Sequence, residues 1–412
     1  MDRRVVVTGL GPVTPIGTGK AAFWEALCAS RSGVRRVDDR VDLSGIDVRI
    51  GAPVLDFDPL EYMDRRRARR IDRAAQFALV ATRLALIDAG LEPRDLEPER
   101  GGVIVGTGIG GLQTMEEAFA TLIESGPRRV SPFFIPRLMP NAIAGEIAIE
   151  YGLRGPNFGV VSACASAAHA IGMAGELIRS GLLDCAVAGG SEAVLVRIAY
   201  AGFAQMGAIS KRNDQPERAS RPFDRERDGF VMGEGAGILI LEERKHALAR
   251  GARINAELVG FGMSDDAEHI TAPAENGAGA AQAIAVALKR AGVSPQKIDY
   301  LNAHGTSTSL NDKAETEAIK GVFGEAAYNL KISSTKSQIG HLLGAAGGVE
   351  AIATILSIEH GFIPATLNYE YPDPDCDLDY TPKSVKRTID TALSNSFGFG
   401  GQNAALIFRS VD

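Results

Sequence analysis

Cys164 is the residue of this chain best suited to nucleophilic chemistry. It stands in Val-Val-Ser-Ala-Cys-Ala-Ser-Ala, where an apolar strand-like run gives way to small residues typical of a helix start. Unpaired backbone N–H groups and the positive end of the helix dipole favour a thiolate at such a junction. We therefore expect the pKa of Cys164 to be lowered and its reactivity raised.

Two of the six histidines stand where they could exchange a proton with such a thiol. His304 follows the strand-like run Tyr300-Leu-Asn-Ala, and His341 closes Thr335-Lys-Ser-Gln-Ile-Gly-His as a second apolar helix begins. Histidine is the usual general acid or base near neutral pH. We expect the others to be structural, since they lie in helices or a polar loop: His169, His246, His269 and His360.

A lysine and a glycine-rich turn complete the candidate site. Lys336 lies in an otherwise uncharged Ser/Thr segment, and we expect Glu315 to pair with it and so to position the loop that carries His341. Near the C-terminus, Asn395-Ser-Phe-Gly-Phe-Gly-Gly-Gln402 places Phe399 between glycines. An N–H from this turn, opposite that of Cys164, would form a two-donor oxyanion hole.

Strand-like and helical segments alternate around these residues. The run from Phe158 to Val161 predicts a strand that stops at Ser162, followed by a helix that ends at about Ser180. Residues 165–175 and 342–355 are mostly Ala, Gly, Ile and Leu, with hardly any charge. Helices of this composition are buried between layers, so the pattern indicates a mixed α/β fold with inner helices.

The two halves of the chain resemble one another. Four pairs of segments correspond: 85–96 with 287–298, 102–111 with 299–308, 5–11 with 256–262, and the strand-then-helix unit around Cys164 with 332–344. Such a repeat indicates a duplicated architecture. We predict an N-terminal half, residues 1–250, with the nucleophile, and a C-terminal half, residues 251–412, with His304, Lys336 and His341.

Composition narrows the class of protein. The 412 residues carry a net charge of −7, and four cysteines show no paired or zinc-binding spacing. We expect a reducing compartment and no zinc, with structural roles for Cys28, Cys185 and Cys376. Neither a signal-peptide core nor a bilayer-spanning run opens the chain, so we expect a cytoplasmic protein without a membrane partner.

The glycine loop Gly106-Thr-Gly-Ile-Gly-Gly follows a strand-like run, as a dinucleotide-binding loop would. Its glycines have the spacing GxGxGG rather than GxGxxG, and no acidic residue stands at the distance that binds a ribose. A dinucleotide site is therefore not expected. The glycines instead allow the backbone to pass close to another segment.

One run of basic residues contrasts with the negative net charge of the chain: Arg65, Arg66, Arg67, Arg69, Arg70 and Arg73. Two interpretations remain open, a solvated helix face or a docking surface for an acidic partner, and Arg128 and Arg129 would extend that surface. Nucleic acid is the weaker interpretation, because no aromatic residues interleave with the arginines.

Taken together, nine motifs resemble the β-ketoacyl-[acyl-carrier-protein] synthases, in particular the type II elongating enzymes of fatty-acid synthesis. The likeness spans the chain: Gly9-Leu-Gly, Gly106-Thr-Gly-Ile-Gly-Gly, Ser131-Pro-Phe-Phe, Ser162-Ala-Cys-Ala, Arg221-Pro-Phe-Asp, Asp228-Gly-Phe-Val-Met-Gly-Glu-Gly, Asn302-Ala-His-Gly-Thr-Ser-Thr, Lys336-Ser-Gln-Ile-Gly-His and the C-terminal Phe/Gly turn. The resemblance implies a thiolase-like five-layer αβαβα sandwich, a homodimer, and no metal or redox cofactor.

The resemblance also implies a role for each candidate residue. Cys164 would carry the acyl group, His304 and His341 would handle malonyl decarboxylation, and Lys336 and Glu315 would support them. Phe399 would act as a gate. The substrate-binding positions implied are Ile109, Phe203, Thr306, Thr308 and Phe397, although core packing is an alternative for the first two. Acyl carrier protein would bind at Arg65, Arg66, Arg69, Arg70, Arg128 and Arg129.

Some positions depart from the family pattern or stay open. Gln402 stands where Thr or His is frequent, and Ala165 where some members have Thr, which bears on loop behaviour and pocket shape. Four further positions resemble those that hold a structural cation in some relatives: Asn302, Glu350, Ser394 and Asn395. The alternative is that these residues only form hydrogen bonds in this chain. Two other functions are open, a polyketide-type ketosynthase with the same residues and a non-catalytic chain-length-factor subunit. The presence of Cys164 and both histidines argues against the second.

Overall fold

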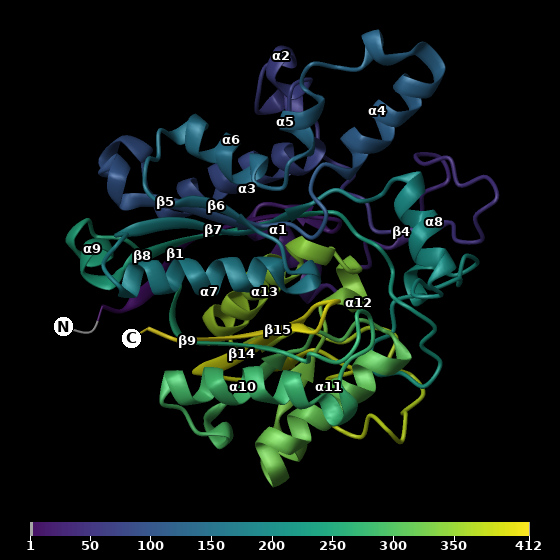
Figure 1. The fold of residues 1–412 in the computed structure, drawn as a ribbon. Helices are drawn as coiled ribbons and strands as arrows, with labels where there is room; N and C mark the ends of the chain where they lie inside the picture. Colours follow the sequence, from purple (N-terminus) through teal and green to yellow (C-terminus); the bar gives the residue numbers. More distant parts are fainter. Residues whose placement is uncertain (1–2, 412) are drawn as a thin grey trace.

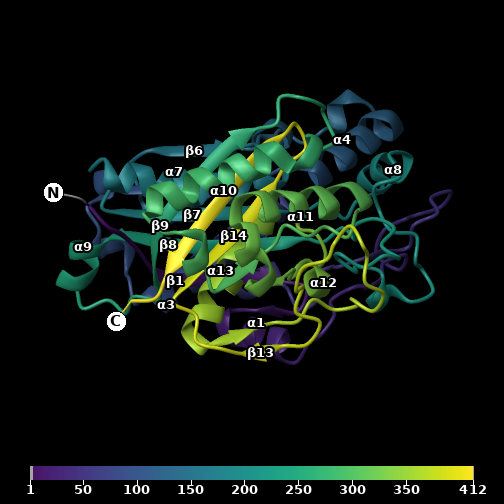
Figure 2. The same ribbon diagram turned by 90° about the horizontal axis from the view of Figure 1, so that it is seen from below.

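The computed structural model describes residues 3–411 and has five layers (Figure 1). Helices α3 (Arg73–Ala89) and α6 (Ala142–Tyr151) cover one sheet, while α7 (Ser166–Arg179) and α13 (Ala346–His360) lie between two sheets. Helices α10 (Ala278–Ala291) and α11 (Ser309–Phe323) cover the second sheet from below, and α10 crosses it in Figure 2. The predicted five-layer αβαβα sandwich is confirmed.

The two sheet layers join at one edge, where β1 (Val5–Thr14) pairs with β9 (Ala256–Asp265), and the strand order is symmetrical about this junction. One half runs β6 (Asn157–Val160), β5 (Gly101–Gly106), β7 (Cys185–Glu192), β8 (Gly235–Glu243), β1, and the other runs β11 (Lys331–Ser333), β10 (Tyr300–Asn302), β14 (Thr391–Phe397), β15 (Gln402–Arg409), β9. The outer three strands of each half are parallel and the inner ones antiparallel. This symmetry supports the division near residue 250, which stays a prediction.

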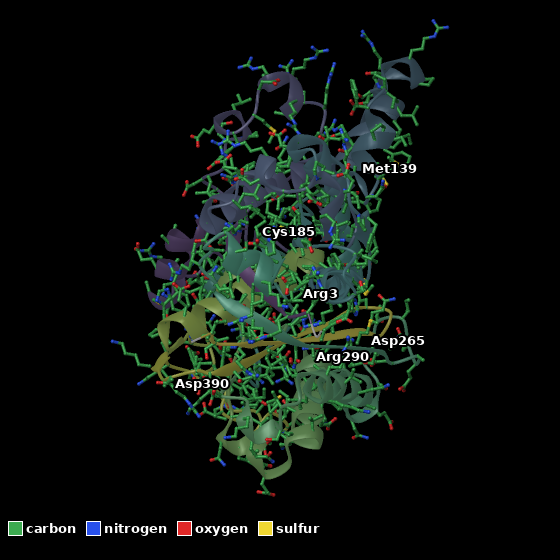
Figure 3. All side chains as sticks on the ribbon, turned by 90° about the vertical axis from the view of Figure 1, so that its left-hand side faces the viewer. Arg3, Met139, Cys185, Asp265, Arg290 and Asp390 are labelled. Atoms are coloured by element: carbon green, nitrogen blue, oxygen red, sulfur yellow. The ribbon has the colours of Figure 1, made fainter. Side chains whose placement is uncertain are left out.

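The inner helices are built from small residues because they lie between two sheets. All residues of α13 from Ala346 to Ile358 are buried, and side chains fill the space between the layers (Figure 3). Gly348 of α13 lies against Gly237 of β8, and a Cβ at Gly348 would overlap the Gly237 carbonyl. This close approach of helix and sheet explains the uncharged composition of these helices.

Six of the remaining helices surround this core, and all four residues of the seventh, α12 (Lys336–Ile339), are buried. The six are α1 (Lys20–Cys28), α2 (Arg65–Ala68), α4 (Leu112–Ser125), α5 (Phe134–Leu138), α8 (Arg197–Gln205) and α9 (Arg244–Ala249). Two short strand pairs lie outside the main sheet: β3 (Arg35–Arg36) with β4 (Ile50–Gly51), and β12 (Phe362–Ile363) with β13 (Val385–Lys386). Strand β2 (Gly17–Thr18) pairs with β1. Within residues 3–411, no helix combines the length and apolar character needed to cross a membrane.

Candidate active site

Cys164 lies at a strand-to-helix junction, as predicted. Strand β6 ends at Val160, a 3₁₀ turn covers Ala163–Ala165, and α7 begins at Ser166. Ala163 has a φ of 48°, a left-handed conformation that is unfavourable for alanine. The chain thus turns sharply just before Cys164 and presents its side chain to the interior of the molecule.

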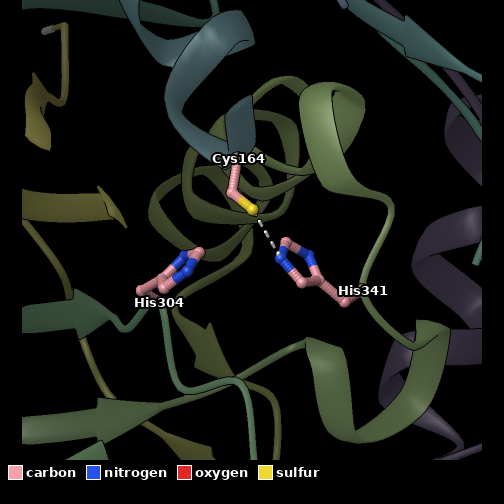
Figure 4. A group of neighbouring side chains, drawn as sticks. All are labelled: Cys164, His304 and His341. Atoms are coloured by element: carbon pink, nitrogen blue, oxygen red, sulfur yellow. Dashed lines mark hydrogen bonds between the residues drawn. The ribbon is translucent and has the colours of Figure 1, made fainter. Parts of the chain in front are cut away.

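The side chains of Cys164, His304 and His341 meet (Figure 4). The His341 Nε2 lies 3.0 Å from the Cys164 Sγ, and one nitrogen from each ring and the Sγ all lie within 4.8 Å of one another. Exposure is 8% for Cys164 and 2% for each histidine. Three residues that are far apart in sequence therefore form one buried cluster that combines a nucleophile with two proton-exchanging groups.

Lys336 determines the tautomer of His304. Its ammonium group donates to the His304 Nδ1 at 3.3 Å, so this nitrogen is an acceptor and the Nε2 carries the hydrogen. Burial and the positive charge of Lys336 hold the pKa of both His304 and His341 well below the usual range. Both imidazoles are therefore neutral at physiological pH, and His304 offers an N–H to a substrate.

The predicted pairing of Lys336 with Glu315 is wrong. The Lys336 ammonium instead contacts the carboxylate of Glu350 in α13, where both side chains are at most 1% exposed. Glu315 accepts from the N–H groups of His304 and Gly305 at 2.9 and 2.7 Å. It therefore holds the loop of His304 rather than that of His341. Burial raises the pKa of Glu315 to about 7, against the effect of these hydrogen bonds.

The signal for Glu350 was present in the sequence. It is the one charged residue among positions 342–355, in a segment otherwise made of small and apolar residues. A lone carboxylate in a buried helix needs a cationic partner, because an unpaired buried charge is costly. The isolated charge of Lys336 in an uncharged segment is its natural counterpart.

The predicted lowering of the Cys164 pKa is also wrong. Burial raises the pKa of this thiol to about 12, while the charge of Lys336 and the backbone N–H of Phe399 oppose the rise. Helix α7 begins two residues after Cys164, and the desolvation of the sulfur outweighs the effect of the helix end. The resting side chain is a thiol, and His341 is placed to exchange its proton.

The C-terminal glycine turn lies against the nucleophile. It joins β14 to β15, and Gly398 packs so close to Ser162 that a Cβ there would lie 2.7 Å from the Ser162 carbonyl oxygen. Gly400 and Gly401 have φ values of 90° and 81°, which favour glycine. The Phe399 N–H is directed at the Cys164 sulfur, and its role as the second oxyanion donor stays a prediction.

A cavity of about 470 Å³ opens onto the Cys164 cluster. Its lining includes every predicted substrate-binding position: Ile109, Phe203, Thr306, Thr308 and Phe397. Cys164 itself packs in one apolar cluster with Phe230 and Leu343, against which Phe203 also packs. Phe230, which was not predicted, stands edge-on to His341 with 5.3 Å between ring centroids. The cavity thus has an apolar side next to the thiol and a threonine-bearing side next to His304.

The predicted carrier-binding arginines lie outside this cavity. Arg65, Arg66, Arg69 and Arg70 in and after α2 are exposed, as are Arg128 and Arg129, and we call these six residues the basic surface. The Arg70 guanidinium lies 4.8 Å above the Phe133 ring, which brings α2 next to the start of α5 (Figure 1). Arg67 differs from them, since it pairs with Glu146 and Glu150 of α6.

The four positions compared with a cation site are buried, and two of them contact residues of the site: Glu350 contacts Lys336, and Asn395 donates to Glu315. Within the described residues, three of their oxygen atoms are buried without a hydrogen-bond partner: Oδ1 of Asn302, Oε2 of Glu350 and Oδ1 of Asn395. Oxygen ligands of this kind suit a hard cation. Cation binding at these positions stays a prediction.

Comparison with known proteins places the chain in a family. Residues 2–247 match the family model "Beta-ketoacyl synthase, N-terminal domain", and residues 255–370 match "Beta-ketoacyl synthase, C-terminal domain". The chain therefore belongs to the β-ketoacyl synthase family. It is 50% identical to a 3-oxoacyl-[acyl-carrier-protein] synthase 2 of Synechocystis over 408 residues, which covers 99% of this chain and 98% of the relative.

Solved structures show the same relationship. A β-ketoacyl synthase from Burkholderia phymatum superposes with a TM-score of 0.92 at 40% identity, and the match covers all of both chains. A ketosynthase bound to a hexaketide, in complex with a type II PKS acyl-carrier protein, superposes with a TM-score of 0.93 at 38% identity over the full length of both chains. The thiolase-like fold expected from the motifs is thus shared with these ketosynthases.

Proposed function

We propose that this chain is an acyltransferase that condenses an acyl group on Cys164 with malonyl-[acyl-carrier-protein], with loss of carbon dioxide. The product is a β-ketoacyl-[acyl-carrier-protein] two carbons longer, as in fatty-acid biosynthesis. One observation carries the proposal: a buried thiol, two neutral imidazoles and a backbone N–H converge on one cavity. Such a cluster can both accept an acyl group and stabilise an enolate.

In the first half-reaction, the Cys164 sulfur attacks the thioester carbon of an acyl-carrier protein. The Nε2 of His341 takes the thiol proton and returns it to the departing carrier thiolate. The N–H groups of Cys164 and Phe399 hold the oxyanion that forms in between. The Nδ1 of His341 has no hydrogen-bond partner among residues 3–411, so this ring is free to adopt either tautomer.

In the second half-reaction, the malonyl C–C bond breaks, carbon dioxide leaves, and the electron pair forms an enolate. His304 donates to the thioester oxygen from Nε2–H, and His341 does so in its Nε2–H tautomer. The enolate carbon then attacks the acyl-Cys164 thioester, and the Cys164 thiolate leaves and takes a proton from solvent. Lys336 positions the His304 ring by donating to Nδ1, and Glu315 positions the His304 backbone by accepting from its N–H.

The proposal includes the partners. An acidic carrier protein would bind the basic surface, since exposed arginines favour association with acidic proteins. We also propose a homodimer formed at β6, which pairs within the described residues with β5 alone and exposes Phe158 and Val161 beside that edge. A cytoplasmic location is proposed because the four cysteines are free thiols.

An elongation assay with purified acyl- and malonyl-carrier proteins tests this function. We expect β-ketoacyl products from straight-chain acyl donors. A polyketide-type ketosynthase is the second candidate, favoured by the likeness to the hexaketide-bound ketosynthase. Failure with every straight-chain donor, together with turnover of β-polyketoacyl donors, would replace the fatty-acid assignment with this candidate.

A further inference from the structure

Glu192 is a buried carboxylate that the catalytic steps above do not use. It is the last residue of β7, its side chain is fully buried, and no ion pair to it exists in the described part of the chain. It accepts four hydrogen bonds, from the N–H groups of Gly108, Ile109 and Gly344 at 2.6, 3.3 and 2.9 Å and from the Thr107 hydroxyl at 3.0 Å. The carboxylate is thus satisfied almost entirely by backbone donors.

These donors come from two separate turns. Gly108 follows β5 in the N-terminal half, whereas Gly344 lies in the 3₁₀ turn Leu343–Ala345 that leads into α13. One oxygen of Glu192, the Oε2, accepts from both glycines and so joins the turns directly. The two turns are in tight contact, since a Cβ at Gly344 would overlap the Gly108 nitrogen. Glu192 therefore acts as a clamp between the two halves.

Both clamped turns form walls of the cavity. Gly108, Ile109 and Leu343 line it, whereas Glu192 does not. Leu343 has a φ of 45°, a conformation that a leucine keeps only where its surroundings enforce it. Leu343 and Cys164 belong to the same apolar cluster, so the clamped turns border the apolar side of the cavity next to the thiol.

A glutamine cannot replace this carboxylate. An ionised carboxylate has acceptor sites on both oxygens, but the amide of glutamine replaces one oxygen with an N–H donor. In one orientation of the amide, its N–H would face the N–H groups of Gly108 and Gly344. In the other, it would face the N–H of Ile109 and the hydroxyl of Thr107. Burial raises the pKa of Glu192 to about 7, and the donated hydrogen bonds oppose this rise and favour the ionised form.

We propose that Glu192 is a positioning residue that clamps the turns of Ile109 and Leu343 and thereby determines the acyl chain-length selectivity of the enzyme. This inference rests on the proposed function, in which the acyl group of acyl-Cys164 occupies the apolar side of the cavity. A fixed wall admits chains of one length and excludes others, whereas a wall that moves accepts several lengths. Glu192 thus acts through the backbone of Ile109 and Leu343 and not by touching substrate.

The test compares the full-length wild type with Glu192→Gln. The kcat/KM is measured for straight-chain acyl-carrier donors from butyryl to palmitoyl, and the KM separately for malonyl-carrier protein. We expect the ratio of kcat/KM between the best and the worst donor to contract by about tenfold, the factor that corresponds to one lost charge-assisted hydrogen bond. The KM for malonyl-carrier protein should change by less than about twofold, since a weakened clamp leaves the malonyl side intact.

Two further variants separate positioning from general stability. Thr107→Val removes one donor to the same carboxylate without a change of charge, and we expect a smaller contraction in the same direction. Glu242→Gln is the matched control, because Glu242 is a fully buried carboxylate held by Thr8, His246 and Arg250 outside the cavity lining. It should lower the unfolding temperature and leave the donor profile unchanged.

An unchanged donor ratio in Glu192→Gln would overturn the inference. So would an equal loss for all donors and for malonyl-carrier protein, the pattern of a merely destabilised enzyme. If Glu192→Gln does not fold, Thr107→Val decides, and a wild-type profile in that variant refutes the clamp. A wild type that condenses no donor would instead refute the proposed function, so the two failures are distinguishable.

Discussion

Lys336→Met separates the two roles that the structure gives Lys336. The side chain is 1% exposed, pairs with Glu350 and donates to the Nδ1 of His304. Methionine is similarly long and unbranched but carries neither charge nor N–H, so it fills the same space. The substitution removes an ion pair and a tautomer-determining hydrogen bond at once, and each loss has its own readout.

The stability effect follows from the ion pair. Removal of one partner from a buried pair costs roughly 3–5 kcal/mol, because Glu350 is left uncompensated. At about 2.1 cal/mol/K per residue, the 412 residues have an unfolding entropy of about 0.87 kcal/mol/K, so the unfolding temperature should fall by roughly 3–6 °C. The double variant Lys336→Met/Glu350→Gln leaves no unpaired charge and should recover most of this loss.

The activity effect follows from the histidine. Without Lys336, the proton of His304 is no longer directed to Nε2, and the enolate loses a fixed donor. Loss of one such donor lowers the rate by about a hundredfold to a thousandfold. Release of carbon dioxide from malonyl-carrier protein should fall by this factor, while single-turnover acylation of Cys164, in which His304 is not needed, should fall by less than about tenfold.

Stopped assays of carbon dioxide release and of Cys164 acylation, with calorimetry on the same samples, give the three readouts. The double variant should regain its unfolding temperature and remain defective in decarboxylation. If it regains both, Lys336 serves only as an ion-pair partner of Glu350. If acylation and decarboxylation fall equally in Lys336→Met, the assignment of separate steps to His304 and His341 is wrong.

Three further outcomes are expected. Cys164→Ala should show no mass increase by intact-protein mass spectrometry after incubation with acyl-carrier protein, and a persistent adduct would assign the nucleophile elsewhere. Because burial lowers the pKa of both active-site histidines well below the usual range, neither ring should take up a proton near pH 6.5, and the NMR signals of the two rings should show no titration there; a midpoint near 6.5 for either ring would contradict this. Arg65→Glu with Arg69→Glu should raise the KM for both carrier substrates by about tenfold at low salt, whereas Arg67→Gln, which breaks the pairs with α6, should chiefly lower the unfolding temperature.

The sequence predicted which residues would meet but not how their charges would be balanced. Cys164 and His341 were found because each stands where an apolar helix begins, and His304 because it follows a strand-like run. Glu315 and Glu350 are both acidic and both near Lys336 in sequence, and only the packing of α13 between the sheets brings Glu350 to it. The Cys164 pKa likewise depends on burial by distant segments, Phe230 and Leu343 among them, which no local pattern contains.

The symmetry of the sheets explains why one thiol faces two histidines. The 3₁₀ turns Ala163–Ala165 and Leu343–Ala345 occupy matching places before the two inner helices, and their first residues have nearly equal φ values of 48° and 45°. Cys164 is the middle residue of one turn and Gly344 of the other. A side chain at Gly344 would collide with Gly108, so the second turn cannot carry a nucleophile of its own. The C-terminal half supplies both histidines instead, and the duplicated fold therefore yields one asymmetric active site.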